Sequence, residues 1–513
     1  MKRNYKSPLL RLLKKVVNET VERSSDTEKI IQDKGRREFI RNSSMAAIGV
    51  GLSPALLSSC ANSGGAEELL DVAIIGGGIA GLHAGHLLKK NNFGFKIFEA
   101  TEKTGGRIFT VYDKLGKNTS TELGGEFIDS NHEDMLNLAK EFGLGLLDME
   151  KDVQDSGLIK DTYFFDGKHY TEKEIISAFA GFAKKIEADI NLVEEEDEAA
   201  LAKFDMISID AYLAEKGITG WLYEMLTKAY TSEMGMDSSK QSALNMLYML
   251  DTDTTGGFKV FGDSDERYKI EGGNGKLIEM LTDALKGNIE TNSACQKIEL
   301  DREQNRYAIS FASGKKVKAT YLLIAIPFTA LRKVELLVEL PEEKKRAINE
   351  LGYGTSSKLI VGFNKQFWRG DGFSGYLFSD IVQNGWDSSA GQNNNAGEGS
   401  YTVFLGGEVG AGLEESASDT YLQQLYKIFP STSNGFNNNK VVYNWSKNPN
   451  VNGGYASYAV GQWSSIAGHE QTSVGNMFFA GEHCSEDFQG YMNGGAETGR
   501  VAAEGIIEAM KPR

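Results

Sequence analysis

A glycine-rich turn between an apolar run and a helix-like segment has the residue types and spacing to bind a phosphate. The run 70–75 leads directly into Gly76, Gly78 and Gly81, with Ala80 before the last glycine. The first glycine permits a tight turn, the second lets the backbone approach a pyrophosphate, and the third allows close packing of helix on strand. The free N–H groups at the start of that helix would face the anion. The pattern therefore predicts a nucleotide-binding strand, turn and helix.

A carboxylate follows at the distance where such a unit binds ribose. A second strand-like run, 95–98, ends at Glu99, which lies 99 − 76 = 23 positions beyond Gly76. An acid about this far along the chain accepts hydrogen bonds from the ribose hydroxyls of a dinucleotide. Glycine triplets also occur in ordinary turns, but strand, turn, helix, strand and acid in this order favour dinucleotide binding.

Two further glycine segments carry charges that could complete the site. Arg107 follows Gly106, and Glu126 follows the pair Gly124 and Gly125. A guanidinium held behind glycines can neutralise a pyrophosphate, although a surface charge is the alternative for Arg107. Both segments have the composition of loops, so we expect them to return to the same site.

The rest of the chain must position these loops. Residues 172–250 show helical spacing of apolar side chains and predict a mostly helical insertion. Further elements are predicted as strands at 296–300, 307–311, 321–326, 358–363, 401–405, 441–443 and 477–479, and as helices at 276–284 and 494–510. The alternation in the later strands indicates an antiparallel sheet. The first and last segments are expected to build one domain and the middle portion the other.

Composition narrows the class of protein. A chain of 513 residues that is 41% hydrophobic is expected to form two domains, since single cores stop growing near roughly 250–300 residues. The formal net charge of −16 argues against nucleic-acid binding, which needs a basic face. It could modestly concentrate cationic substrates, but solubility is the simpler role, and the acidic run 194–198 is expected to be a solvated helix face or loop. Cys295 and Cys484 are expected to be free, with a single disulfide as the alternative.

The first sixty residues have the features of an export signal. A basic segment containing Arg36 and Arg37 is followed by the mildly apolar stretch 45–57 and then by Ser58, Ser59 and Cys60. The stretch is too short to cross a bilayer, which takes about 20 residues. The pattern resembles a twin-arginine leader with a lipobox, so it predicts translocation to the bacterial cell envelope and a lipid anchor at Cys60. An amphipathic helix that stays attached is the alternative.

Several separated segments together resemble the flavin-dependent amine oxidase family, which includes monoamine oxidases, polyamine oxidases and L-amino-acid oxidases. The resemblance spans about residues 70 to 509 and is carried by 76–82, Glu99, 105–107, 123–125, 272–273, Lys358, 445–455, 479–482 and 490–492. It implies an α/β fold, with a Rossmann-like FAD-binding domain of the GxGxxG glutathione-reductase type. The second domain would be a mixed substrate domain of antiparallel sheet plus helices. We expect a leader and linker at 1–66 and FAD-binding parts at 67–150, 265–330 and 467–513. The substrate domain would have a helical part at 151–264 and an antiparallel sheet at 331–466.

The resemblance implies FAD as cofactor and assigns the residues that hold it. Arg107 would neutralise the pyrophosphate, Glu482 would accept hydrogen bonds from the ribityl chain, and Met492 would lie beside the flavin ring. Gly454 stands before Tyr455, where relatives with covalent FAD carry a cysteine, so noncovalent FAD is expected. The cofactor-binding residues implied are Gly76, Gly78, Ala80, Gly81, Glu99, Gly106, Arg107, Gly124, Gly125, Gly481, Glu482, Tyr491 and Met492.

The same resemblance assigns catalytic roles to Lys358, Tyr455 and Tyr491. Lys358 would lie near flavin N5 through a water and assist oxygen reactivity or imine hydrolysis. Tyr455 and Tyr491 would form an aromatic cage that binds the substrate and, by excluding water, favours the neutral amine. A solvated strand lysine and two core tyrosines are the structural alternatives.

The reaction implied is oxidative deamination: hydride passes to flavin N5, the imine hydrolyses, and dioxygen reoxidises the flavin to give peroxide. A monoamine or polyamine is favoured over an amino acid, because Glu126 stands near where L-amino-acid oxidases carry a carboxylate-binding arginine. Glu126 could hold a distal ammonium or support the flavin site indirectly. The alternatives are an L-amino-acid oxidase, a C–C or ring dehydrogenase of the phytoene desaturase or protoporphyrinogen oxidase type, and a flavin-binding module without catalysis.

His483 is expected to serve packing rather than acid–base chemistry, although it follows the turn that ends in Glu482. The amine needs little help from a general base if it enters deprotonated. The histidines show no metal-ligand spacing, and the sequence lacks HExxH and CxxC motifs, so no metal is expected.

Overall fold

The computed structural model describes residues 68–392 and 397–511. The predicted leader, including Arg36, Arg37 and Cys60, lies outside the described residues. Within them, no helix is both long and apolar enough to cross a membrane.

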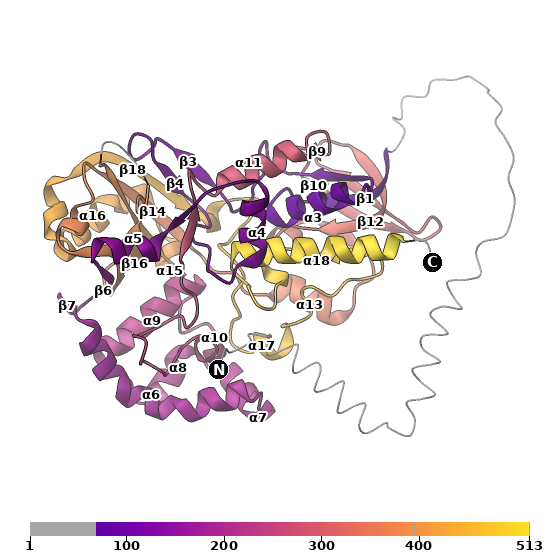
Figure 1. The fold of residues 1–513 in the computed structure, drawn as a ribbon. Coiled ribbons are helices and arrows are strands. Elements are labelled where there is room, and N and C mark those ends of the chain that lie inside the picture. The colour runs from indigo at the N-terminus through magenta and orange to yellow at the C-terminus, as the bar shows by residue number, and fades with distance from the viewer. Residues whose placement is uncertain (1–67, 393–396, 512–513) are drawn as a thin grey trace, which may run out of the picture. The chain divides into compact units, whose positions relative to one another are not determined.

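A mixed sheet forms the centre of the first domain (Figure 1). Its order is β13-β10-β11-β12-β1-β2-β9, with β19 also paired to β12. β1 pairs with β2, and β12 with β19, in parallel. The strands are β1 (Glu68–Ile75), β2 (Phe95–Phe98), β9 (Ile289–Glu290), β10 (Cys295–Asp301), β11 (Arg306–Phe311), β12 (Lys316–Ile324), β13 (Glu335–Leu337) and β19 (Met477–Phe479).

Alternate residues of β1 face two separate cores. Val72 and Ile74 pack under helices on one face, while Ala73 and Ile75 belong to the core of the other face. Burial on both faces explains the continuous apolar run, which is typical of a central parallel strand. The first core is covered by α3 (Ile79–Lys90), α4 (Glu133–Glu141), α11 (Gly275–Ala284) and α18 (Met492–Met510).

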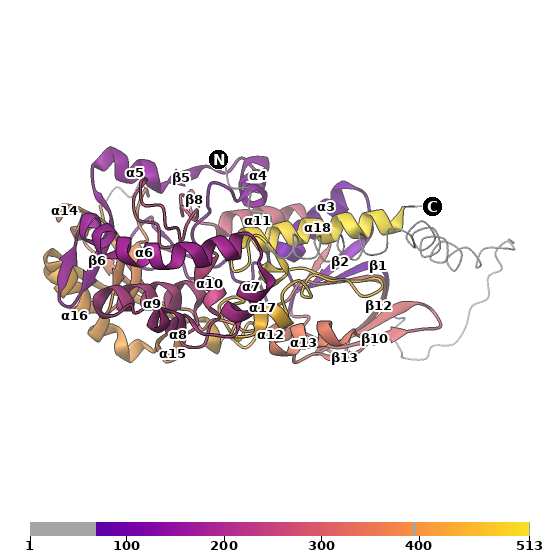
Figure 2. The same cartoon turned by 90° about the horizontal axis from the view of Figure 1, so that it is seen from below.

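Helices α3 and α18 lie side by side in both views (Figures 1 and 2). Glycine permits this approach, since a Cβ on Gly499 would lie 2.2 Å from the carbonyl oxygen of Ala80. The N-terminal and C-terminal parts of the chain therefore share one helical layer, as the sequence predicts.

The second sheet has the order β18-β14-β17-β16-β15-β6-β7. All neighbouring strands are antiparallel except β6 and β15, which are parallel. The seven strands are β6 (Ile159–Phe165), β7 (Lys168–Tyr170), β14 (Ser357–Phe363), β15 (Phe373–Ser379), β16 (Gln383–Asp387), β17 (Gly399–Leu405) and β18 (Phe436–Asn444). Every residue of β14 is buried, so this strand holds Lys358 inside the protein.

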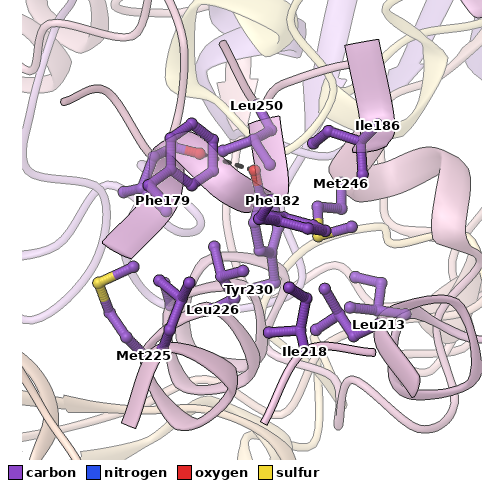
Figure 3. Packing of buried hydrophobic residues seen from close by; sticks show 14 of the residues in the cluster. Phe179, Phe182, Ile186, Leu213, Ile218, Met225, Leu226, Tyr230, Met246 and Leu250 are labelled. Carbon is purple, nitrogen blue, oxygen red and sulfur yellow. Dashed lines mark hydrogen bonds between the residues drawn. The ribbon is translucent and has the colours of Figure 1, made fainter. Parts of the chain in front are cut away.

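A helical layer packs near the second sheet, as predicted for 172–250. Figure 3 shows Phe179, Phe182, Tyr230 and Leu250 facing one another in its core, and the hydroxyl of Tyr230 donates to the carbonyl oxygen of Val260 at 2.6 Å. The helices are α6 (Glu172–Glu194), α7 (Glu198–Asp205), α8 (Ile209–Glu215), α9 (Gly220–Met234) and α10 (Ala243–Leu247). The acidic run between α6 and α7 is exposed except at Glu196, which is buried at a positive φ.

Shorter elements complete the fold. The remaining strands are β3 (Thr110–Tyr112), β4 (Ser120–Glu122), β5 (Leu146–Asp148) and β8 (Tyr268–Ile270). The remaining α-helices are α5 (Met149–Ser156), α12 (Phe328–Leu331), α13 (Glu342–Glu350), α14 (Phe367–Gly370), α15 (Gly407–Ala411), α16 (Ser418–Ile428) and α17 (Gln462–Ser465). The 3₁₀ turns are η1 (Glu415–Ala417), η2 (Pro430–Asn434), η3 (Trp445–Lys447) and η4 (Glu482–Cys484).

The architecture is the expected α/β fold with two differences in detail. Strands β6 and β7 lie in the range expected to be helical, 151–264, because they extend the second sheet. Strand β13 lies in the range assigned to the substrate domain, 331–466, but pairs with β10 of the first sheet. Cys295 and Cys484 are free.

Candidate functional site

The glycine turn after β1 has the geometry of an anion cradle. Gly76 has a φ of +112°, and a Cβ there would lie 2.5 Å from the carbonyl oxygen of Ala325. At Gly81 a Cβ would lie only 2.0 Å from the carbonyl oxygen of Gly76, so the helix needs glycine to reach the turn. Gly78 precedes α3, and no side chain caps the start of this helix. A Cβ added to Gly78 would meet only the Cα of Gly106 within 4.0 Å, so the backbone here is uncovered. The open helix start and bare backbone fit a pyrophosphate.

Glu99 lies at the edge of this turn, where the sequence places the ribose acid. Its Oε2 accepts from the N–H of Gly77 at 2.8 Å, and its Oε1 accepts from the N–H and hydroxyl of Thr101 at 2.9 and 2.8 Å. The carboxylate is thereby fixed beside the cradle, and its contact with a ribose stays a prediction.

Arg107 and Glu482 form an ion pair that joins three segments. Arg107, which follows Gly106 at a φ of +59°, donates from Nη1 to Oε1 of Glu482 at 2.6 Å and to the carbonyl oxygen of Gly454 at 2.9 Å. Oε2 of Glu482 accepts from the N–H of Gly490 at 2.9 Å. The pair therefore ties the second glycine loop to the segments that carry Tyr455 and Tyr491. Its predicted contacts with pyrophosphate and ribityl chain stay predictions.

The loop of Gly124 and Gly125 is wedged between Arg107 and Met492. The N–H of Gly125 donates to the carbonyl oxygen of Arg107 at 3.0 Å. A Cβ added to Gly124 would lie 1.9 Å from that same oxygen. A Cβ added to Gly125 would lie 2.6 Å from Cγ of Met492. The predicted flavin-side residues Gly124, Gly125 and Met492 are thus in contact. Gly481, at a φ of +138°, donates its N–H to Oγ1 of Thr498 in α18 at 2.9 Å.

Lys358 reaches this loop from β14. Its Nζ donates to the carbonyl oxygens of Glu122 and Gly124 at 3.0 and 2.9 Å, and to Oε2 of Glu126 at 2.9 Å. An ammonium group has three N–H donors, so the protein engages them all. Lys358 is 4% exposed, which excludes the alternative of a solvated strand lysine.

Glu126 is held between two ammonium groups. Its Oε1 lies 3.4 Å from Nζ of Lys269, which sequence reasoning did not single out, and its Oε2 contacts Lys358. Burial alone would raise the pKa of Glu126, but Lys358 and Lys269 hold that pKa below its usual value. Both oxygens already contact lysines, which favours an indirect role for Glu126 over binding of a distal ammonium.

The structure brings Tyr455 and Tyr491 together at the end of α9. The hydroxyl of Tyr455 donates to the carbonyl oxygens of Ser232, at 3.3 Å, and Glu233. The hydroxyl of Tyr491 donates to Oε1 of Glu233 at 3.2 Å. A Cβ on Gly490 would lie 3.4 Å from the ring of Tyr455. Burial raises the pKa of both phenols, so both are neutral donors at physiological pH.

The segments that carry Tyr455, Tyr491 and Lys358 are linked through the 123–125 loop. Tyr491 directly precedes Met492, which packs against Gly125, and Lys358 binds the carbonyl oxygen of Gly124. Gly454, directly before Tyr455, accepts from Arg107 at 2.9 Å, and the carbonyl oxygen of Arg107 accepts from the N–H of Gly125. Neighbours of the two tyrosines, and Lys358 itself, therefore contact the 123–125 loop.

Sequence reasoning missed Glu233 and Trp386. Trp386 is buried, with Nζ of Lys358 5.1 Å from its ring centroid, and it stacks on Tyr376 at 6.4 Å. Only Glu233 carries a local signal. An acid in the last turn of a helix opposes the helix dipole, and Gly235 marks that turn as the end of α9. Such a conflict is expected at functional positions.

His483 is packed inside the protein. It is 1% exposed, and its ring lies 4.3 Å from that of Phe328. Its two ring nitrogens have no hydrogen-bond partner among the described residues. Burial lowers its pKa well below the usual value, so the ring is neutral. In the described part of the chain, no group of three or more histidine, cysteine or acidic side chains is arranged to hold a metal ion.

Comparisons with known proteins identify the family. The family described as flavin containing amine oxidoreductase matches residues 79–507. Polyamine oxidase 3 of Oryza sativa subsp. japonica is 25% identical over 450 residues, covering 84% of this chain and 88% of that protein. Flavin-containing amine oxidase B of Homo sapiens is 23% identical over 466 residues, covering 86% of each.

Solved structures share the fold. Cyclohexylamine oxidase from Brevibacterium oxydans IH-35A matches with a TM-score of 0.73 at 20% identity, covering 86% of this chain and 100% of that one. Putrescine oxidase bound to putrescine matches with a TM-score of 0.70 at 19% identity, covering 86% and 99%. The chain therefore belongs to the flavin-containing amine oxidoreductase family and is a flavin-dependent amine oxidase with FAD as its cofactor.

Proposed function

We propose that the enzyme oxidatively deaminates a primary or secondary amine held between Tyr455 and Tyr491. When bound, FAD would take a hydride from the carbon bearing the nitrogen and pass the electrons to dioxygen, giving peroxide, while water converts the imine to a carbonyl product. The observation that carries this proposal is the meeting of the two tyrosine hydroxyls at Glu233.

The side chains around the cage prepare the amine for this reaction. Only a neutral amine readily gives up hydride, and a water-poor aromatic site favours the neutral form. The two phenols hold their rings in place by donating to the end of α9. Arg107 and Glu482 fix the segments that present these rings.

We propose that FAD is held without a covalent bond. The residue before Tyr455 is Gly454, and a Cβ at this position would lie 2.6 Å from Oγ of Ser356. The site therefore has neither the thiol nor the space for one. Denaturation should release all of the FAD into the supernatant, and flavin that stays with the precipitated protein would contradict the proposal.

The function is tested by mixing the yellow holoenzyme with amines in the absence of oxygen. Bleaching of the flavin absorbance by at least one of tyramine, 1,4-diaminobutane or spermidine, with peroxide formed on admitting air, is the expected result. Bleaching by leucine or tryptophan alone would indicate an L-amino-acid oxidase. A flavin that no amine or amino acid bleaches would refute the proposed activity and leave the dehydrogenase or the non-catalytic alternative.

Lys358→Met is expected to slow reoxidation of the reduced enzyme by dioxygen by roughly 100-fold, the usual effect of removing one stabilising group from a developing charge. The resemblance places this lysine near the flavin, and its ammonium would stabilise negative charge as oxygen is reduced. Stopped-flow reoxidation measures the effect. Lys269→Met is the matched control, because Lys269 shares Glu126 but does not bind the glycine loop. Unchanged oxygen kinetics in Lys358→Met would remove the residue from this role.

We also propose that the protein is exported and anchored through Cys60, on the pattern of Arg36, Arg37 and residues 57–60. In a bacterial host with a twin-arginine pathway, wild-type protein should fractionate with membranes and carry the mass of a lipid on Cys60. Cys60→Ala should move the enzyme to the soluble fraction. An unprocessed N-terminus in the membrane fraction would contradict lipidation.

A further inference from the structure

Glu233 holds an unusual position beside the tyrosine pair. Its main-chain oxygen accepts from Tyr455 and its carboxylate accepts from Tyr491 at 3.2 Å. The side chain is only partly exposed, and it lies in the last turn of α9, where the helix dipole disfavours a negative charge. Glu233 is therefore an acid at the edge of the proposed cage whose ionised form is disfavoured by its own helix.

Two further carboxyl groups face Glu233. Asp129 accepts from the N–H of Glu266 at 3.0 Å and from the hydroxyl of Ser264 at 2.8 Å, which places Glu266 beside it. Charges on Glu266 and Asp129 interact with that of Glu233. Like charges in a buried site repel one another, so each carboxylate makes the next one more costly to ionise.

No basic side chain of the described residues forms an ion pair with this group, although the charge of Lys160 acts on Glu266. Among the described residues, no lysine or arginine forms an ion pair with Glu233, Glu266 or Asp129. Nε2 of His132 lies 3.6 Å from Oδ2 of Asp129, but burial lowers the pKa of His132 to about 4, so the imidazole is neutral. By contrast, Glu126 across the site is paired with two lysines. Buried carboxylates are normally paired, so this group lacks a cation next to the position proposed for the substrate.

We propose that Glu233, supported by Glu266, binds a second, cationic nitrogen of the substrate, so that the enzyme acts on diamines or polyamines in preference to monoamines. The inference rests on the proposed function, since it takes Tyr455 and Tyr491 as the walls that hold the reacting nitrogen. A substrate ammonium supplies the charge that the protein omits. Its N–H donors match the free acceptor capacity of the carboxylates, because Tyr491 engages only one oxygen of Glu233.

The test compares 1,4-diaminobutane with butylamine, which lacks the second nitrogen. Anaerobic reduction of the holoenzyme by each amine gives a preference, the ratio of the two values of kcat/KM. Glu233→Gln keeps an oxygen to accept from Tyr491 and leaves the main-chain acceptor of Tyr455 in place, but removes the charge. We expect the preference of wild type for the diamine to fall by about 30-fold or more, the usual effect of breaking a buried charge pair.

Glu470→Gln is the matched control. Glu470 is buried where Glu233 is partly exposed, but it likewise accepts from a tyrosine hydroxyl, that of Tyr458 at 2.5 Å, and its pKa is raised by burial to about 7, as is that of Glu233. It contacts neither Tyr455 nor Tyr491 and should leave the preference unchanged. If Glu233→Gln fails to retain flavin, Glu233→Asp carries the test, because it keeps the charge and must keep most of the preference.

The pH profile separates a charge effect from a structural one. The groups that face Glu233 are Tyr230 on its own helix, Tyr455, Tyr491, Asp129 and Glu266, with Lys160 of β6 near Glu266. With a pKa raised to about 7, Glu233 is neutral in acid, so the diamine preference should strengthen as pH rises through 7. In Glu233→Gln this rise should be absent.

Three outcomes would overturn the inference. If butylamine and the diamine have equal kcat/KM in wild type, or if Glu233→Gln leaves the preference intact, Glu233 does not bind the second nitrogen. The proposed oxidase function would still stand. If Glu233→Gln slows both amines equally, the residue acts on the reacting nitrogen instead. If no amine reduces the flavin, the proposed function fails as well.

Discussion

Gly81→Ala is expected to give a colourless protein. The added Cβ would lie 2.0 Å from the carbonyl oxygen of Gly76, far inside van der Waals contact, and the atom it meets is backbone. Helix α3 would have to move away from β1, which opens the cradle and moves the amide groups that face the pyrophosphate. Overpacking of this kind costs about 3 kcal/mol. If this cost destabilises the FAD-bound protein relative to the free protein, FAD affinity drops by roughly 100-fold.

Flavin content of the purified protein and the dissociation constant of added FAD measure this effect. Gly181→Ala is the matched control, because Gly181 lies in the exposed middle of α6 and a Cβ there meets nothing within 4 Å. That change should leave flavin binding intact and stabilise the protein by about 0.5–1 kcal/mol, since alanine is the better helix former. A yellow Gly81→Ala protein with normal FAD affinity would show that the turn does not bind the cofactor.

The sequence was a good guide wherever local chemistry decides structure. At Gly76 and Gly81 only glycine fits, and the glycine spacing in the sequence indicates this requirement. The same holds for Gly124 and Gly125, which pack against Arg107 and Met492. Gly81 is required by the backbone of its own motif, whereas Gly76 and Gly125 meet Ala325 and Met492, which lie far along the chain. The positions of Gly76 and Gly125 could be predicted from the motif pattern but not from their neighbours.

Other features depend on distant pairing and could not be predicted in the same way. Strand β13 joins the first sheet by pairing with the edge of β10. Nothing within residues 335–337 indicates that β10 is its partner. The sequence does contain a pattern that indicates the hairpin of strands β6 and β7. Asp166 and Gly167, both at positive φ, form the two-residue turn typical of a hairpin.

The electrostatics of the site were the least accessible from sequence. The interpretation of Glu126 as an acceptor for a distal ammonium follows from its place after a glycine loop. Lys269 changes that interpretation, and it comes from a strand 143 residues further along the chain. Glu233 is likewise brought to the tyrosines by the end of α9. Ion pairing depends on tertiary neighbours, so a charge can be located from sequence but its partner cannot.

Glu482→Ala is expected to disrupt both halves of the site at once. The substitution removes the acceptor of Arg107 at 2.6 Å and of the N–H of Gly490 at 2.9 Å. Arg107 then keeps the carbonyl oxygen of Gly454 but loses its only carboxylate partner among the described residues, and the N–H of Gly490 loses its acceptor. The two side chains are 23% and 7% exposed, so breaking this mostly buried pair costs about 3 kcal/mol, the lower end of the cost for a fully buried one. The segments before Tyr455 and Tyr491 lose their common anchor, so amine oxidation should be lost along with much of the flavin.

Denaturant unfolding measures the loss of stability, flavin content measures the loss of cofactor, and anaerobic reduction by amines measures the loss of activity. Glu339→Ala is the control, since it breaks an arginine–glutamate pair of similar length, 2.9 Å to Arg302, whose side chains are 75% and 83% exposed. An exposed pair contributes less than about 1 kcal/mol, so this variant should keep its colour and activity. Equal losses in the two variants would mean that burial does not set the strength of the Arg107–Glu482 pair. A stable, active Glu482→Ala enzyme would show that the tyrosine pair is positioned by α9 alone.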